Sequence, residues 1–545
     1  MRKKGDISVS RMKFLSNFVI SNAYWIGPVL FLVYVVSVVP LNYGFNSDSG
    51  LKLLQTKALL ESNFSDQGVY YPGESIDPEY KYHPYNKFLI ANPAGGVWGQ
   101  YPIFFSALSA PLLALFGISS LVPLCIFAYL LSIILFQRIY KPSKFVIFFA
   151  LVCSPILLYA LEYSENTLFL LLSSSGLFLY FKDPDMRVKP WRLFWSGLLI
   201  GTTVWLRLES FIFIPVLGIS ILIVRFREIG SGSFWKENLI LGVGVLLPLL
   251  ACLFYNYLEY GNAIGPRFVV SGKNTWEWAG KLKQLFVLLF FGYWKVGFFG
   301  YMPLLLVVFI VQFRNWSIAT KRVKILLTLC ILYIPLISIV VGTEAIVSWG
   351  PRYLSLAIFP SLMLMDEFYK ASFQGVKNIW ALTLLILLTL FSFWVTYSGF
   401  KMIRASYKQI KSVSQEIGAY KSDYVVTGSE LVSGHYGRLI LNTPTFLVRS
   451  RSDGEELIKR LSTLGKGRKL LFLVSLYESE DVHRRADNGQ LNVFSIFKSV
   501  TPNILQYGNL SNEDNGNLIS LLKRHSSLVQ EEEVTDGLRS FVFVF

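Results

Sequence analysis

The chain has 545 residues, of which 53% are apolar and only 16% are charged, and its formal net charge is +16. A soluble domain carries about 25% charged residues, so this composition excludes an ordinary soluble protein and indicates contact with lipid. The positive charges lie in short loops between apolar stretches, which is typical of membrane topology control and argues against a nucleic-acid partner.

The first apolar stretch follows a basic segment that contains Arg2, Lys3, Lys4, Arg11 and Lys13. It lacks a small-residue cleavage site, so we expect an uncleaved anchor over 23–41 and not a removed signal peptide. Because Lys and Arg are enriched on the cytoplasmic side, the N-terminus is predicted to be cytoplasmic. A long polar loop, 42–100, then lies outside.

The next segment, 101–117, is apolar but short, and it contains two prolines. If it crossed the membrane, the later basic loops would fall outside and the nearly uncharged loops inside, against the usual charge rule. We therefore predict that this segment lies along the outer surface or re-enters the membrane.

Ten further spans then alternate, with the basic loops inside and a second long loop, 258–297, outside. The inner segments hold 21 Lys and Arg residues, whereas the three short outer turns hold none, one and one. The sequence thus predicts a multi-pass protein of the plasma or inner membrane with eleven spans. After the first, these cover 118–137, 145–160, 167–181, 193–206, 210–224, 238–257, 298–313, 325–342, 353–369 and 378–399.

The tail, 401–545, has a different pattern. Strand-like runs such as YVVTG and KLLFLVSLY alternate with helical patterns such as GEELIKRLSTLG, which predicts a small α/β domain. An odd number of spans places this domain on the extracytoplasmic side. We divide the chain into a membrane module, 1–400, with outer loops 42–117 and 258–297, and the C-terminal domain, 401–545.

The first outer loop offers two candidate features. Asp48, in the sequence N-S-D-S-G, lies just past the first span, where a carboxylate can act as a general base. The alternative is that Asp48 only caps the following helix. His83 lies in a mixed acidic and aromatic stretch of the kind that binds carbohydrate, although the same composition suits a packed loop. A single His without a second one nearby is a poor metal ligand set.

The short outer turns carry further ionisable residues. Arg207 and Glu209 lie between two spans, where a charge is costly and an Arg can pair with a phosphate. The alternatives are a mutual pair or an Arg that extends to the headgroups. Arg352, in W-G-P-R-Y, would add a second cation at the same face, or serve as an interfacial anchor with Tyr353. Glu165 would orient a cation or a sugar hydroxyl, or simply begin a helix.

Taken together, these motifs resemble the GT-C glycosyltransferases, most of all the protein O-mannosyltransferase and lipid A aminoarabinose transferase branch. The resemblance rests on N-S-D-S-G after the first span, G-Q-Y-P-I-F from Gly99 to Phe104, R-L-E-S, G-P-R-Y-L and the outer C-terminal domain. It covers most of residues 20–400. It implies a GT-C-like α-helical membrane protein of about eleven transmembrane helices.

The resemblance also implies the chemistry. The donor is a sugar on a polyprenyl phosphate, transfer inverts the anomeric carbon, Asp48 is the catalytic base, and Arg207 and Arg352 hold the leaving phosphate. Further substrate-binding candidates are Glu165, Glu209, His83, Tyr101 and Tyr353. The chain departs from many members, which have a paired acidic motif at Asp48-Ser49 and two prolines at Tyr101-Pro102-Ile103.

Several points stay open at this stage. The acceptor is a protein, a lipid or a glycan, and no cofactor is certain, because metal dependence varies within the family. A competing hypothesis is a transporter or flippase of a lipid-linked anion, which would use the same Arg residues but need no base. Another is a non-catalytic partner in envelope assembly.

Overall fold

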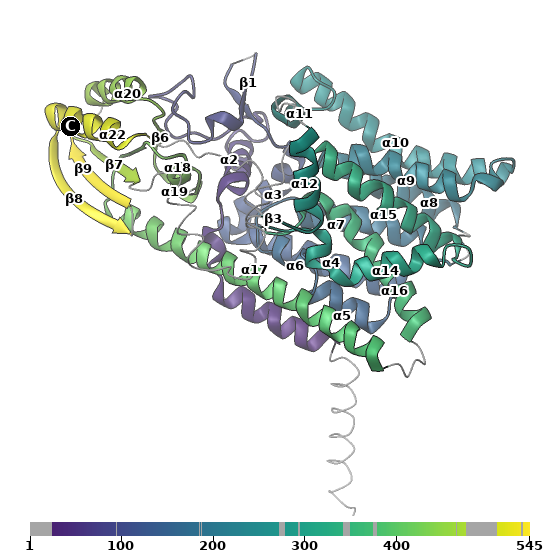
Figure 1. The fold of residues 1–545 in the computed structure, drawn as a ribbon. Helices are drawn as coiled ribbons and strands as arrows, with labels where there is room; N and C mark the ends of the chain where they lie inside the picture. Colours follow the sequence, from purple (N-terminus) through teal and green to yellow (C-terminus); the bar gives the residue numbers. More distant parts are fainter. Residues whose placement is uncertain are drawn as a thin grey trace, which may run out of the picture.

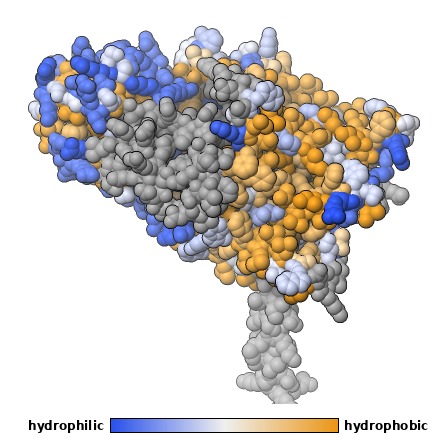
Figure 2. Space-filling view, viewed as in Figure 1, coloured by the Kyte–Doolittle hydropathy of each residue, from blue (hydrophilic) through white to orange (hydrophobic). Residues whose placement is uncertain are grey.

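The computed structural model describes residues 24–545 except 94, 185, 187, 272–277, 293–294, 342–348, 374–378, 436, 465, 476–509 and 536–537. Most of the described chain is helical, and the helices gather in one large bundle (Figure 1). The surface over this bundle is mainly hydrophobic (Figure 2), as contact with lipid requires. Among the described residues, four helices are long and apolar enough to cross a bilayer, namely Ile118–Tyr140, Gly232–Tyr260, Lys321–Val340 and Ile379–Ala419. The chain is therefore an integral, multi-pass membrane protein.

Within the described residues, each predicted span coincides with helix. The first contains the helix Tyr24–Val38. The others contain α4 (Leu121–Leu135), α5 (Lys144–Val152) with α6 (Ile156–Tyr159), α7 (Asn166–Tyr180), α8 (Pro190–Thr202), α9 (Ser210–Val224), α10 (Gly232–Tyr260), α13 (Phe298–Tyr301) with α14 (Pro303–Arg314), α15 (Lys321–Val340), α16 (Ile358–Phe373) and α17 (Ile379–Ala419). That all eleven cross the bilayer stays a prediction. The basic N-terminal segment and most of the turn 343–352 lie outside the described residues.

The first outer loop folds into two helices joined through a small ribbon. These are α2 (Ser47–Glu61), the antiparallel strands β1 (Leu89–Ala91) and β2 (Val97–Gly99), and α3 (Ile103–Phe116). With 14 residues, α3 is about 21 Å long, shorter than the roughly 30 Å of a hydrocarbon core. This length suits the surface or re-entrant helix predicted for 101–117, although its place relative to the bilayer stays a prediction.

After the helical bundle, the described part of the tail forms a five-stranded sheet. Its strand order is β6 (Thr445–Leu447), β5 (Tyr424–Thr427), β7 (Lys469–Ser475), β9 (Leu538–Val544) and β8 (Ser527–Thr535). β5 is parallel to both of its neighbours, and β9 is antiparallel to both of its own. The helices α20 (Arg451–Leu464) and α22 (Asn512–His525) pack on the same apolar core as the sheet, which they enter through Leu457, Leu461, Leu518 and Leu522. Continuous apolar runs such as KLLFLV suit strands that are covered by helices.

One helix links the bundle and the sheet. α17 has 41 residues and is therefore about 60 Å long, twice the thickness of a hydrocarbon core. It runs without a break through residue 400, where we placed the domain boundary, and reaches the sheet (Figure 1). The division into two domains stays a prediction.

The sheet is also connected to the start of α2. Two short helices after β5, α18 (Glu430–His435) and α19 (Gly437–Asn442), make this contact. The Gly437 amide donates to the Phe45 carbonyl at 3.1 Å, and the Tyr85 hydroxyl donates to the Gly434 carbonyl at 3.1 Å. A Cβ at Gly437 would lie 2.3 Å from the Phe45 carbonyl oxygen, so only glycine permits this approach. The sheet is thus fixed to the backbone three residues before Asp48.

Candidate active site

Asp48 lies in the first turn of α2, after a residue with unusual backbone geometry. Ser47 has a φ of +45°, a left-handed conformation that is uncommon outside glycine and often marks a functional site. The Ser47 hydroxyl lies 3.5 Å from Asp48 Oδ1 and donates to it. A carboxylate in the first helical turn is also favoured by the helix dipole. The start of α2 is therefore built to hold an ionised carboxylate.

Arg352 is the direct partner of Asp48. Its Nη1 lies 2.9 Å from Asp48 Oδ2, although 304 positions separate the two residues. Gly350, with a φ of +93°, and Pro351 turn the chain so that Arg352 begins the 3-10 helix η7 (Arg352–Ala357). The side chains of Arg352 and Asp48 are 17% and 27% exposed. The ion pair is thus shielded from bulk water but open on one side.

Arg207 is held more firmly, by three acceptor side chains. Its Nη1 donates to Glu165 Oε1 at 3.2 Å and to Asn166 Oδ1 at 2.6 Å, and its Nε donates to Glu209 Oε1 at 3.0 Å. Lys52 of α2 pairs with the other oxygen of Glu165 at 2.5 Å. The mutual pair of Arg207 and Glu209, which the sequence left open, is therefore present. It belongs to a buried chain of alternating charges.

Arg267 completes the set of guanidinium groups. It lies on the short helix α11 (Pro266–Ser271) of the second outer loop, and its guanidinium carbon is 5.1 Å from the centre of the Tyr101 ring. Among the described residues no carboxylate lies within ion-pair distance of Arg267. Arg207 and Arg352 are both paired with carboxylates, so within the described site Arg267 is the guanidinium side chain that remains available for an anion.

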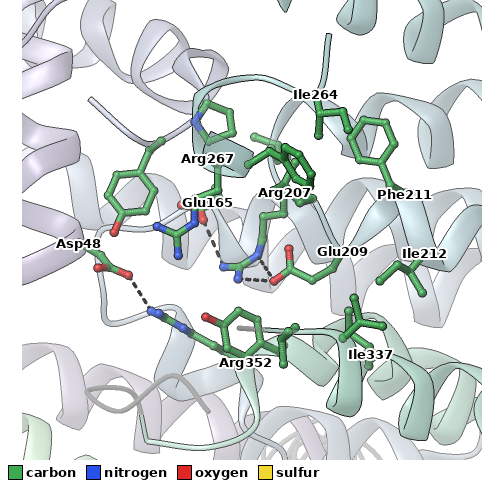
Figure 3. Close-up of a pocket in the computed structure, with 18 of the residues that line it drawn as sticks. Asp48, Glu165, Arg207, Glu209, Phe211, Ile212, Ile264, Arg267, Ile337 and Arg352 are labelled. Atoms are coloured by element: carbon green, nitrogen blue, oxygen red, sulfur yellow. Dashed lines mark hydrogen bonds and ion pairs between the residues drawn. The ribbon is translucent and has the colours of Figure 1, made fainter. Parts of the chain in front are cut away.

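These side chains line one cavity of about 440 Å³. Figure 3 shows that the cavity is divided chemically along its length. One end carries charged groups, including Asp48, Glu165, Arg207, Arg267 and Arg352. The other end is apolar and is formed by Phe211, Ile212, Ile264 and Ile337. Such a cavity fits a molecule with an anionic head and a hydrocarbon chain.

The charges of the site act differently on two of its carboxyl groups. Burial favours a higher pKa for Asp48, but the positive charges of Arg352, Lys52 and Arg267 outweigh it and lower that pKa below its usual range. For Glu162, in the turn before α7, burial dominates and raises the pKa to about 7. At neutral pH, Asp48 is therefore ionised and Glu162 is about half protonated. Within the described ranges, no group of three or more His, Cys, Asp or Glu is placed to bind a metal ion.

The structure brings seven of the eight predicted site residues to the cavity: Asp48, Tyr101, Glu165, Arg207, Glu209, Arg352 and Tyr353. His83 is not among the lining residues. It is fully buried, its Nδ1 accepts from the Tyr85 amide at 3.0 Å, and its ring centre is 4.6 Å from that of Tyr71. Burial lowers the pKa of His83 to about 3. In this placement His83 is an uncharged part of the packing of the first outer loop.

Sequence analysis missed two cations of the cavity, both from the second outer loop. A signal for Arg267 was present, because Gly265-Pro266-Arg267-Phe268 has the same pattern as the segment around Arg352. The glycines of the two segments also share a positive φ, +92° at Gly265 and +93° at Gly350. Lys281, on α12 (Trp278–Leu289), donates to the Val341 carbonyl at 2.7 Å. No local pattern points to that contact.

Comparison with known proteins identifies the fold. No protein-family model matches the sequence, and no curated protein matches it. Among solved structures, ArnT from Cupriavidus metallidurans in the apo state is 12% identical with a TM-score of 0.56, over 94% of this chain and 97% of ArnT. ArnT from the same organism bound to undecaprenyl phosphate gives 12% identity and a TM-score of 0.52 over the same shares. The chain thus has the GT-C fold that the resemblance implied.

Proposed function

We propose that this GT-C protein transfers a sugar from a polyprenyl-phosphate-linked donor to an acceptor at the outer face of the membrane. The observation that carries the proposal is the single cavity with Asp48 and guanidinium groups at one end and an apolar wall at the other (Figure 3). A polyprenyl phosphate has the same two parts. The ArnT structure with undecaprenyl phosphate bound supports the proposal, because it is a protein of the same fold.

The charge of the cavity suits one phosphodiester. The described lining residues include four cations and three carboxylates, which leaves a formal charge of +1. A sugar phosphodiester carries a single negative charge. Among the described residues Arg267 forms no ion pair that a phosphate would have to break, so Arg267 is the first phosphate ligand. Arg352 becomes the second when its side chain turns from Asp48 to the phosphate. Arg207 stays paired with Glu165 and Glu209 and contributes its charge from the wall.

The transfer step then assigns each group a role. The acceptor hydroxyl gives its proton to an oxygen of Asp48, and its own oxygen forms the new bond to the anomeric carbon. The bond from that carbon to the phosphate oxygen breaks, and its electron pair stays on the phosphate, which the guanidinium groups stabilise. Attack opposite the leaving group inverts the anomeric carbon.

Because Asp48 and the donor phosphate share Arg352, the basicity of Asp48 depends on whether a donor is bound. While Arg352 is paired with Asp48, it lowers the pKa of that carboxyl and makes Asp48 a weak base. When a phosphate draws Arg352 away, the pKa of Asp48 rises toward its usual range. Asp48 thus becomes an effective base only when a donor is present.

The topology completes the proposal. With the N-terminus cytoplasmic and eleven spans, Asp48, the cavity and the C-terminal sheet all lie on the extracytoplasmic side. The contact of α19 with the residues before Asp48 supports a role for the C-terminal domain in presenting the acceptor, which is a protein, a lipid or a glycan.

The test uses the purified full chain in nanodiscs, supplied with lipid-linked sugars extracted from membranes of the source organism. Mass spectrometry follows the release of free polyprenyl phosphate. We expect release by the wild type and by Asp66→Asn, which changes an exposed carboxylate of the same loop, and release that is about 10²- to 10⁴-fold slower by Asp48→Asn. A transporter needs no base, so equal donor movement across vesicles by wild type and Asp48→Asn, with no donor consumed, would refute the transferase.

A further inference from the structure

The part of α17 beyond its apolar stretch carries a row of basic side chains. Lys401, Arg404, Lys408 and Lys411 are three, four and three residues apart, so they lie along one side of the helix. No Asp or Glu occurs between residues 400 and 415. Lys401, Lys408 and Lys411 are exposed, and Arg404 is partly exposed. These four residues are called the basic row below.

The neighbouring side of α17 fixes the basic row close to the candidate site. It is buried through Phe400, Ile403, Tyr407 and Ile410. The Tyr407 hydroxyl donates to the Leu161 carbonyl at 3.3 Å, in the turn that carries Glu162. The Tyr407 ring also packs against Gly44, where a Cβ would lie 2.3 Å from it. The basic row therefore lies at the same membrane face as the cavity, about one helix diameter (10–12 Å) from the turns that form it.

Within the part of the chain that the structure describes, no carboxylate neutralises the charges of the basic row. Among the described residues none of the four forms an ion pair with a carboxylate, whereas Lys81, Arg449 and Arg460 in the same outer part do. The Nε of Arg404 is buried without a hydrogen-bond partner. The Lys401 ammonium lies only over an aromatic ring, 5.9 Å from the centre of Tyr397. Four like charges on three helical turns repel one another, so an external anion would stabilise them.

The position of the basic row matches the depth of lipid headgroups. Trp394 and Tyr397, which are 37% and 39% exposed, are of the type found at the membrane interface. Lys401 follows Tyr397 by one helical turn. Each headgroup layer is about 5–8 Å thick and α17 rises about 15 Å from Lys401 to Lys411. Lys401 and Arg404 therefore lie at headgroup depth, with the other two farther out. In Figure 2, hydrophilic surface follows the hydrophobic surface along the lower left edge, where α17 continues toward the sheet.

We propose that the basic row binds the phosphate groups of anionic lipid headgroups in the leaflet into which the cavity opens. The proposal rests on α17 as the last span and does not require the transferase activity. Charge complementarity, the interfacial aromatics and the missing carboxylate partners favour a lipid over an acidic protein. The bound headgroups would lie beside the turns that carry Glu162 and lead to Asp48.

The test measures lipid binding to the full chain in a neutral detergent. Native mass spectrometry counts the phosphatidylglycerol and phosphatidylcholine that the protein retains during a titration with each. The variant K401Q/R404Q/K408Q/K411Q removes the basic row. The matched control, K459Q/K466Q/R468Q/K469Q, removes the same charge from exposed positions of α20, of the segment before β7 and of the first residue of β7. Like the basic row, these four side chains form no ion pair with a carboxylate among the described residues.

We expect the wild type and the control to retain more phosphatidylglycerol than phosphatidylcholine. In the basic-row variant the ratio of the two retained lipids should be roughly 10-fold smaller, as expected for the loss of cations at headgroup depth. Unchanged retention of phosphatidylglycerol by the variant, or an equal loss in the control, would overturn the proposal. So would displacement of the lipid by inorganic phosphate at equal concentration, or loss of a co-purifying acidic protein without loss of lipid. Donor consumption in zwitterionic micelles should be the same for wild type and variant, so a failure here is separate from a failure of the transferase.

Discussion

The shared position of Arg352 predicts that Asp48→Asn will separate binding from catalysis. In the wild type, donor phosphate and Asp48 compete for the same guanidinium group. Asparagine keeps the size of the side chain but removes its charge, so Arg352 becomes free for the phosphate. The substitution should therefore strengthen binding of polyprenyl phosphate while it removes the catalytic base. Loss of an ordinary substrate ligand would weaken binding instead.

The magnitude follows from the geometry. At the N–O distance of 2.9 Å, the Coulomb energy of the pair is about 1.4 kcal/mol in water and about 6 kcal/mol at an effective dielectric constant of 20. Because both side chains are partly open to the cavity, we expect a value of about 1–3 kcal/mol. This corresponds to roughly 5- to 150-fold tighter binding. Loss of the base should lower kcat by about 10²- to 10⁴-fold.

Two measurements on purified protein check this prediction. Binding of undecaprenyl phosphate is titrated in detergent, and kcat is measured at saturating donor by mass spectrometry. Asp66→Asn, an exposed carboxylate on the same loop, serves as the control and should change neither value. The reasoning is refuted if Asp48→Asn binds undecaprenyl phosphate more weakly than the wild type, or if kcat is retained.

Three further predictions concern other groups of the site. Arg267→Gln should weaken undecaprenyl phosphate binding by roughly 10- to 100-fold, as loss of a charge-assisted hydrogen bond implies, and an unchanged Kd would contradict its assignment. Gly437→Ala should lower kcat about 10-fold or more, because its Cβ displaces Phe45 and misplaces Asp48, whereas Gly434→Ala, with open space at its Cβ, should match the wild type. The raised pKa of Glu162, about 7, means that the unfolded chain loses this proton at lower pH than the folded one, so stability falls as pH rises from about 4.5 through 7. Glu162→Gln should therefore raise Tm at pH 8 and not at pH 5, and an equal effect at both would argue against a buried ionised carboxylate.

The sequence located the helices and most of the charged end of the cavity. Apolar stretches give helix positions directly, and Arg207 and Arg352 stand out because a charge between apolar spans is costly. The pairing of Arg352 with Asp48 could not be predicted, since nothing local links residues 304 positions apart. From the sequence, Lys52 has the pattern of a solvated lysine on a helix. Only the structure shows that it pairs with Glu165.

Loop composition was the weakest guide. The stretch around His83 has the residues of a sugar site, yet its aromatic rings pack on one another and on the C-terminal sheet. Composition alone cannot separate a binding surface from a packed one, because both use aromatic rings. In the second outer loop, Gly265-Pro266-Arg267 repeats the pattern of Gly350-Pro351-Arg352, and this repeat is the sequence signal for Arg267.

Because α17 is one continuous helix, we expect the thickness of the bilayer to affect the geometry of the candidate site. A rigid rod of about 60 Å that tilts by roughly 10° moves its far end by about 10 Å. Such a lever acts on the Tyr407 contact with Leu161 and, through the sheet and α19, on the backbone before Asp48. We therefore expect a membrane that is too thin or too thick to strain the backbone before Asp48. In this way we expect the surrounding lipid to influence the position of the Asp48 carboxylate.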